Sequence, residues 1–413
     1  MKPFPVFLFL ITTILSISNS IGANLTWTGN NSSNWGDSTN WNPSGIPGQN
    51  DTANIYSGTF NPQLNSNTSL YRLNLYSGTI DLNGYLLTIS ANANYSGGQL
   101  SNGQLKHYGT GTITIAGTTF NAKVHITANS ILLNGATFND SLTIVKKGTS
   151  PDNSKGGNFF NYPVSLTDSA SGNIILSDSL PDSFGSTLEI ANRSSGKVYI
   201  AHRGVGNVFQ GDVTFNGSKI YSNYYGSASF NGNIYLNTPA GEVYFGVSTG
   251  TANLASGKSI AIIGTGISAG SLSIKNFSQL GASPAISLTL TGSAKVILGS
   301  GNSFNAPVSI TAPSVQLEKT RFLNVVNITH TGVANAVSNG GCYFGGRTII
   351  QHNPSTSCTF SLGNAYVDTF SAPAAIINNS GLIIVGQATF YDSVSFKNNN
   401  SLTSSDRYYV SNA

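Results

Sequence analysis

Residues 229–236 read SFNGNIYL, and variants of this octapeptide recur along the chain. The clearest copies are TFNAKVHI at 119–126, TFNDSLTI at 137–144, SFNAPVSI at 303–310 and TFYDSVSF at 389–396. In each copy, a phenylalanine at position i is followed by apolar residues at i+4 and i+6. These positions share parity, so on an extended chain their side chains point to one side. The Asn, Gly, Pro and Asp residues between them favour corners. Each copy therefore predicts two short strands that meet at a corner and share one apolar face.

The octapeptide belongs to a unit of about 18–26 residues that repeats through most of the chain. The phenylalanines that open the units are Phe120, Phe138, Phe160, Phe184, Phe209, Phe230, Phe304, Phe322, Phe344, Phe370 and Phe390. A second apolar run follows within each unit, as at Val198–Ile200 and Val243–Phe245. One unit cannot bury its apolar side alone, but stacked units can, because each strand pairs with its counterparts above and below. We therefore predict an all-β fold, a right-handed parallel β-helix (solenoid) of about 17 coils and about 80 Å.

A larger repeat is superimposed on the small one. Residues 120–133 align with 304–317 at an offset of 184, and nine of the fourteen positions are identical. This predicts a duplicated block, about 118–248 (the first block) and 302–413 (the second block), within a β-helix that covers 61–413. The second block stops early, so we expect the chain to be a piece of a longer protein or to end in an unusual cap.

The composition argues against a nucleic-acid-binding protein. Charged residues make up only 8% of the 413 residues, against about 25% in typical soluble proteins. The formal net charge is +4, and the basic residues are scattered. We therefore expect no nucleic-acid partner. Short alternating apolar runs separated by Gly and Asn agree with the all-β prediction.

The first 22 residues have the features of a secretory signal peptide. Lys2 precedes an apolar stretch from Phe4 to Ile17, and small residues follow it. The alternative is a membrane anchor, but the stretch is short for a bilayer span, and no later segment is long and apolar enough. We expect a secreted, extracellular protein, associated with a cell surface or free, and a monomer.

The three tryptophans of the chain, Trp27, Trp35 and Trp41, lie within fifteen residues. Two interpretations are open. Their rings could form a platform for stacking against sugars, or they could seal the first coil of the solenoid, where the core would otherwise meet water. We favour the second and assign 23–60 to an N-terminal aromatic-rich cap and first coil.

The two cysteines, Cys342 and Cys358, also leave two interpretations. In an exported protein they could form a disulfide bond. The alternative is a pair of buried free thiols. No histidine spacing around them is typical of a zinc site, and we expect no metal or cofactor.

The start of the mature chain resembles a known kind of protein. The pattern Trp27-x-Gly29 and the spacing of Pro47, Asp51, Ala53 and Ile55 resemble the start of many bacterial secreted β-helix surface proteins. The segment TIDLNGYLLTI at 79–89 resembles the coils that follow there. The octapeptide is similar to repeats of adhesin-like proteins on Bacteroidetes surfaces. The resemblance covers nearly all of the mature chain and implies architecture and export, but it implies no particular ligand.

Function is the least constrained property. Fifteen acidic residues are spread along the chain, which disfavours a catalytic face. Asp182 and Asp368, two residues before a coil phenylalanine, suit a structural role in a turn. The basic pair His202–Arg203 has no carboxylates beside it in sequence. We expect a structural or adhesive protein, a cell-surface stalk or weak multivalent binder of polysaccharide or of a neighbouring cell surface, without catalysis. The alternative is a carbohydrate-active β-helix enzyme, a polysaccharide lyase or hydrolase.

Overall fold

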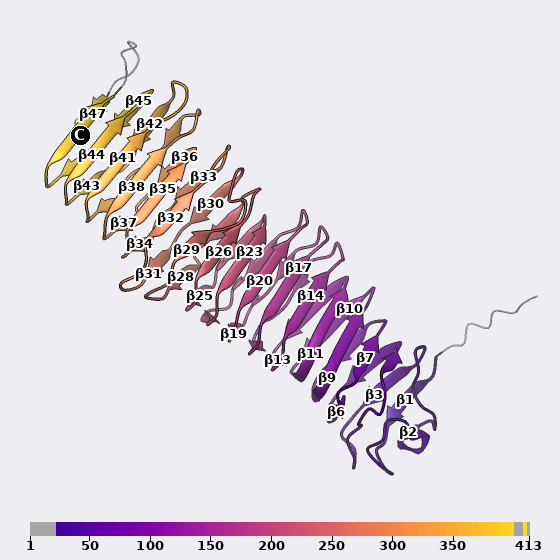
Figure 1. Cartoon of the computed structure of the whole chain (residues 1–413). Coiled ribbons are helices and arrows are strands. Elements are labelled where there is room, and N and C mark those ends of the chain that lie inside the picture. The colour runs from indigo at the N-terminus through magenta and orange to yellow at the C-terminus, as the bar shows by residue number, and fades with distance from the viewer. Residues whose placement is uncertain (1–21, 400–407, 411–413) are drawn as a thin grey trace, which may run out of the picture.

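The computed structural model describes residues 22–399 and a strand at 408–410, which form one elongated parallel β-solenoid (Figure 1). The predicted signal peptide lies outside these residues except for Gly22. The chain makes about 16 turns, so that at about 4.8 Å a turn the solenoid is about 75 Å long. The predicted all-β parallel solenoid is confirmed. Its right-handed sense stays a prediction.

Each typical coil contributes three strands, which stack into three ladders; the sequence had indicated at least two. The phenylalanine ladder contains β6 (Thr79–Asp81), the first halves of β9 (Gln99–Tyr108) and β11 (Thr119–Ala128), β13 (Thr137–Phe138), β16 (Phe159–Phe160), β19 (Ser183–Phe184), β22 (Asn207–Phe209), β25 (Ser227–Phe230), β28 (Thr251–Leu254), β31 (Phe277–Gln279), β34 (Ser303–Phe304), β37 (Arg321–Phe322), β40 (Tyr343–Phe344), β43 (Asp368–Phe370) and β46 (Ala388–Phe390).

The aliphatic ladder contains β4 (Thr68–Leu70), β7 (Leu86–Ile89), the second halves of β9 and β11, β14 (Leu142–Lys146), β17 (Val164–Asp168), β20 (Leu188–Asn192), β23 (Val213–Gly217), β26 (Ile234–Asn237), β29 (Ile260–Ile262), β32 (Ile286–Thr289), β35 (Val308–Ala312), β38 (Val326–His330), β41 (Thr348–His352), β44 (Ala374–Asn378) and β47 (Val394–Asn398).

The third ladder contains β1 (Asn24–Trp27), β3 (Thr52–Ile55), β5 (Arg72–Leu75), β8 (Ala93–Tyr95), β10 (Thr112–Ala116), β12 (Ser130–Asn134), β15 (Asp152–Asn153), β18 (Ile174–Ile175), β21 (Val198–Ile200), β24 (Ile220–Ser222), β27 (Val243–Phe245), β30 (Ser271–Ile274), β33 (Lys295–Leu298), β36 (Ser314–Leu317), β39 (Ala336–Val337), β42 (Thr359–Leu362), β45 (Leu382–Val385) and β48 (Tyr408–Val410).

The repeated octapeptide builds the core as its spacing predicts. The phenylalanine rings of β11, β13, β16, β19, β22 and β25 stack in one buried column with centroids 4.5–5.4 Å apart. The residues at i+4 and i+6 are buried beside them, as Val124 and Ile126 show. A second stacked column runs from Phe304 to Phe390. Burying these stacked rings stabilises each coil of the two blocks.

The phenylalanine column departs from the repeated pattern at two places. Leu254 and Gln279 occupy it between the two blocks, and the buried Gln279 is held by hydrogen bonds to Lys258 and Ala306. At the last described coil, Phe390 is only partly buried and Phe396 is 39% exposed. Phe396 pairs in register with the buried Ile376, so it lies at the inward position that the octapeptide predicts, although it is incompletely covered at this last described coil.

The third ladder is interrupted at equivalent places in the two blocks. No strand pairing joins β12 to β15 or β36 to β39. Side chains replace it, because the hydroxyl of Ser154 accepts from the Leu133 amide and that of Ser338 accepts from the Leu317 amide. Both pairs differ by the offset of 184. The break falls beside the corner where the aliphatic ladder ends, and the polar side chains described below lie there.

The N-terminal end carries the tryptophans. The short strand β2 (Trp41–Asn42) pairs antiparallel with β1, just after a 3₁₀ turn at Ser38–Asn40. Trp27, Trp35 and Trp41 are buried and pack together, with centroids 4.7–6.4 Å apart. This is the packing that a cap requires. The rings have no open face on which a sugar could stack.

Candidate functional site

A cluster of aromatic side chains lies on the outside of the third ladder, midway along the molecule. It contains Tyr199, Tyr221, Tyr224, Tyr225, Tyr244 and His202, and we call it the tyrosine patch. Tyr199, Tyr221 and Tyr244 come from β21, β24 and β27, three successive coils that pair in register. The other members come from the corners that follow β21 and β24.

Alternation along these short strands places the tyrosines outside. In β21, Val198 and Ile200 point into the core, so Tyr199 between them points out. The same alternation applies to Tyr244 in β27. After β18, β21 and β24 the chain turns through a residue with positive φ, namely Ser177, Ala201 and Asn223. This stacked left-handed corner brings the segments after β21 and β24 alongside the outer face of the strands.

The rings form a continuous surface with two orientations. Tyr221 stacks on Tyr199 at 5.0 Å and on Tyr244 at 4.7 Å. Tyr224 and His202 pack edge-on or tilted against this stack, and Tyr225 packs against both. Tyr221 is 9% exposed and Tyr225 is 45% exposed. The patch is thus a packed base of rings with a more exposed rim.

Charged groups lie at the edges of the patch. His202 Nδ1 and Asp178 Oδ1 are 2.8 Å apart, and Arg203 lies 3.8 Å from the same carboxylate oxygen. Arg203 also lies over the Tyr225 ring and Lys197 over the Tyr221 ring. No carboxylate stands beside His202–Arg203 in the sequence, but in the structure the preceding coil brings Asp178 to both side chains. A linear scan misses such pairs, since a residue one coil away is about 18–26 positions away in the sequence.

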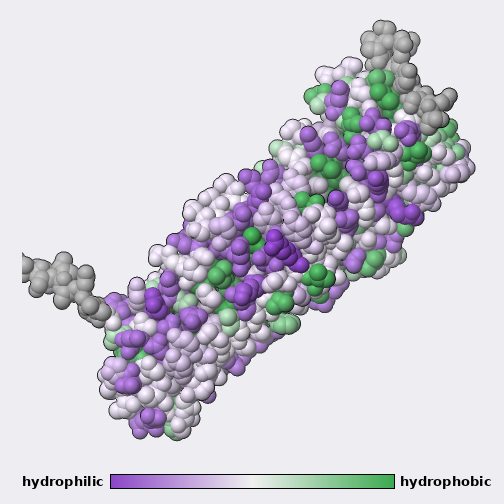
Figure 2. Space-filling view, turned by 180° about the vertical axis from the view of Figure 1, so that it is seen from behind, coloured by the Kyte–Doolittle hydropathy of each residue, from purple (hydrophilic) through white to green (hydrophobic). Residues whose placement is uncertain are grey.

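Burial raises the pKa of Tyr199 and, more strongly, that of Tyr221. These phenols therefore stay neutral at physiological pH. Neutral aromatic faces suit sugar C–H groups, and phenol hydroxyls can donate to and accept from sugar hydroxyls. A separate hollow of about 450 Å³ lies along the aliphatic ladder, where it is lined by Glu189 of β20, Asn216 of β23 and Arg193, which follows β20. Figure 2 shows one face of the molecule on which hydrophilic and hydrophobic side chains are interspersed, without a broad apolar area.

The cysteines do not form the disulfide that their presence allowed. Cys342 and Cys358 are free thiols, and both are buried. They lie at different corners of the coil, because β40 and β41 separate them along the chain. The amide of Cys342 donates to Asp368, whereas the thiol of Cys358 donates to the carbonyl of Gly332. The alternative of two buried free thiols describes the structure.

The two aspartates that precede coil phenylalanines have a structural role. Asp182 Oδ1 accepts from the backbone and side-chain amides of Asn158, one coil earlier. Asp368 accepts from the Cys342 amide in the same way. Burial raises the pKa of each carboxyl to about 6. Neither lies on an outer face where a substrate could reach it.

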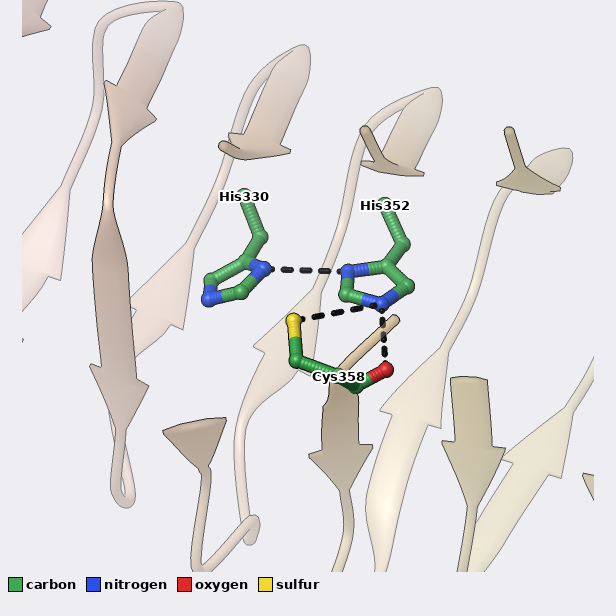
Figure 3. A group of neighbouring side chains, drawn as sticks. All are labelled: His330, His352 and Cys358. Carbon is green, nitrogen blue, oxygen red and sulfur yellow. Dashed lines mark hydrogen bonds between the residues drawn. The ribbon is translucent and has the colours of Figure 1, made fainter. Parts of the chain in front are cut away.

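One group of side chains within the described residues has the composition of a metal site. His330, His352 and Cys358 are buried, and one potential ligand atom of each lies within 4.8 Å of the others (Figure 3). The two Nδ1 atoms are 3.0 Å apart, and His352 Nε2 lies 3.0 Å from the Cys358 carbonyl oxygen. The expectation that no histidine lies at a metal-binding spacing missed this group, because the coils bring the ligands together.

Neither cluster was found from the sequence. The tyrosine patch had a usable signal, since the runs VYI, IYS and VYF place a tyrosine at the same outward position in three coils.

No family model, curated protein or solved structure matches the chain. No helix in the described part of the chain is long and apolar enough to cross a membrane.

Proposed function

We propose that the protein is an exported, structural or adhesive β-solenoid that holds polysaccharide weakly through the tyrosine patch. The observation that carries the proposal is the packed outer surface of five tyrosines on three consecutive coils. Aromatic residues that pack on a regular ladder lose little further entropy when a ligand binds, so the surface is preorganised.

The rest of the molecule fits a carrier of such a surface. The patch lies on an eight-stranded parallel sheet from β15 to β36, one side of an elongated rod, and charged side chains are few in the sequence. A single patch of this size gives weak binding, but a polysaccharide repeats its units. Many chains anchored on one surface would bind it together far more strongly than one chain does. A stalk or adhesive surface outside the cell is the role that this geometry serves best.

The alternative of a carbohydrate-active enzyme has one observation in its favour. His202 and Asp178 form a hydrogen-bonded pair within the tyrosine patch. A histidine oriented by a carboxylate can act as a general base, and a nearby tyrosine can act as an acid. Cleavage of a polysaccharide at this place would need both groups.

One experiment separates the two functions. The purified mature chain is incubated with neutral and acidic polysaccharides, and both retention and new chain ends are measured. The proposal predicts retention of at least one polysaccharide with no new ends. New ends that disappear in His202→Asn would establish the enzyme instead. Absence of both signals from every polysaccharide would contradict a binding role and leave only a stalk.

A further inference from the structure

The corner where the aliphatic ladder ends carries polar side chains inside the solenoid. In the second block, Ala312, His330, His352 and Asn378 follow one another in register. In the first block, Ala128, Lys146, Asp168 and Asn192 hold the equivalent places. The corner is therefore the same structural position in both blocks, with different chemistry.

In the first block this corner holds a buried cation. The Lys146 ammonium donates to the carbonyls of Asn129 and Ser150 and lies 2.9 Å from Asp152. Both side chains of the ion pair are almost completely buried. A positive charge is stable there because a carboxylate and two carbonyls surround it.

In the second block no lysine occupies the equivalent place. His330 replaces Lys146, and Ala336 stands 184 positions after Asp152. Burial and the neighbouring His352 lower the pKa of His330 to about 4, and burial lowers that of His352. Both rings are therefore neutral at physiological pH. The carbonyl of Pro313, the counterpart of Asn129, still lies close enough to favour a proton on His330.

The hydrogen bonds around the two rings leave one ring nitrogen without a partner. Two neutral imidazoles carry one N–H each. One proton lies between His352 Nε2 and the Cys358 carbonyl, and the other lies between the two Nδ1 atoms. The Nε2 of His330 is buried without a hydrogen-bond partner within the described residues. A cation between the two Nδ1 atoms would replace the shared proton, so that each ring carries its proton on Nε2, the usual arrangement of histidine ligands.

We propose that His330, His352 and Cys358 form a buried site for a monovalent soft metal ion, Cu⁺. Thiolate and imidazole are ligands that Cu⁺ prefers. The 3.0 Å between the Nδ1 atoms suits two ligands with metal–nitrogen bonds of about 2.0 Å. On binding, the Cys358 thiol loses its proton to solvent and a sulfur–copper bond forms, with no change of oxidation state.

The overall charge of the metal complex favours a monovalent ion over a divalent one. Cu⁺ with one thiolate and two neutral imidazoles is neutral overall, whereas Zn²⁺ with the same ligands keeps one positive charge. No carboxylate contributes to the electrostatics of these three residues within the described part of the chain. An uncompensated charge in such a place is costly. The neutral complex would match the Lys146–Asp152 pair of the first block, which is also neutral overall.

Metal binding to the reduced, full mature chain tests the proposal. Cu⁺ is supplied without oxygen in a chelator buffer, and bound copper is measured after gel filtration. We expect about one ion per chain. The Cys358→Ser and His352→Asn variants should bind at least tenfold more weakly. Cys342→Ser, which changes the other buried thiol, should bind like the wild type, and circular dichroism should show that each variant is folded.

A second variant covers the case in which those changes unfold the corner. His330→Lys combined with Ala336→Asp imports the ion pair of the first block and should give a folded protein that binds no copper. Equal copper binding by wild type and Cys358→Ser would overturn the proposal. So would no uptake by the wild type, or preferential uptake of Zn²⁺ when both ions are offered.

Discussion

At the scale of the residue, the core of the two blocks depends on one phenylalanine ring in each of their coils. Phe160 is buried between Phe138 at 5.4 Å and Phe184 at 4.5 Å, whereas its neighbour Phe159 is 54% exposed. The octapeptide made this distinction predictable, because parity alone assigns Phe160 to the core. The buried amides and carboxyls were not predictable, because their partners lie one coil away.

Replacing Phe160 with alanine removes one ring from the stacked column and leaves a cavity. We expect a loss of about 3–5 kcal/mol. Phe159→Ala, the matched exposed position, should change stability by less than about 0.5 kcal/mol. The midpoints of denaturant unfolding compare the two variants. Equal midpoints would show that the column does not carry the core.

Asp182 should make stability depend on pH. Its pKa is about 6 in the folded chain against a reference value of 3.8, so the folded state holds this proton more tightly than the unfolded state does. The favourable contribution is full at low pH and is lost as pH rises from about 4 to 6, by about 3 kcal/mol. Asn at this position keeps the acceptor for Asn158 without the charge.

Asp182→Asn should therefore be more stable than the wild type at pH 7.5, with the difference disappearing at pH 4. Denaturant midpoints at the two pH values give the comparison. Parallel pH profiles for the two proteins would contradict a raised pKa. Asn158 and Asn207 already occupy the same column, so the substituted side chain fits the site.

At the scale of the element, corners determine how closely the coils stack. Strand β23 ends at Gly217, which has φ +96, and a Cβ there would lie next to the Asn192 carbonyl of the coil before. Gly117 also has a positive φ of +72, but no atom lies within 4 Å of its Cβ position. The sequence shows both residues as turn glycines and cannot separate them, because the contact involves another coil.

Gly217→Ala should destabilise the protein by about 3 kcal/mol or more, because strain from positive φ adds to a backbone clash. Gly117→Ala should cost only about 1 kcal/mol. The shift in the midpoint of thermal unfolding measures both. A smaller effect at Gly217 than at Gly117 would mean that the coils stack less closely than the ladders imply.

At the scale of the whole molecule, the repeat predicted the architecture and missed the sites. Periodicity specifies interior columns, and these columns dictate a rod (Figure 1). Function depends on outward and corner positions, where the repeat leaves the residue free to vary. Tyr199 and Tyr221 lie at such outward positions, and His330 and His352 at such a corner, so only the stacking of the coils reveals them.

The rod itself is measurable in solution. Small-angle scattering of residues 23–413 should give a cross-section that is constant along a length of about 75 Å for the solenoid. A compact particle with equal dimensions would contradict the stacking of the coils into one rod.

The most direct test of the central claim is the affinity of the protein for whichever polysaccharide it retains most strongly. Tyr224→Ala combined with Tyr225→Ala removes the rim of the patch. The control, Tyr56→Ala with Tyr76→Ala, removes another outer tyrosine pair, stacked at 4.6 Å. We predict that the patch variant binds at least about tenfold more weakly and that the control binds like the wild type. Unchanged affinity in the patch variant, or equal losses in both, would contradict a binding surface at the tyrosine patch.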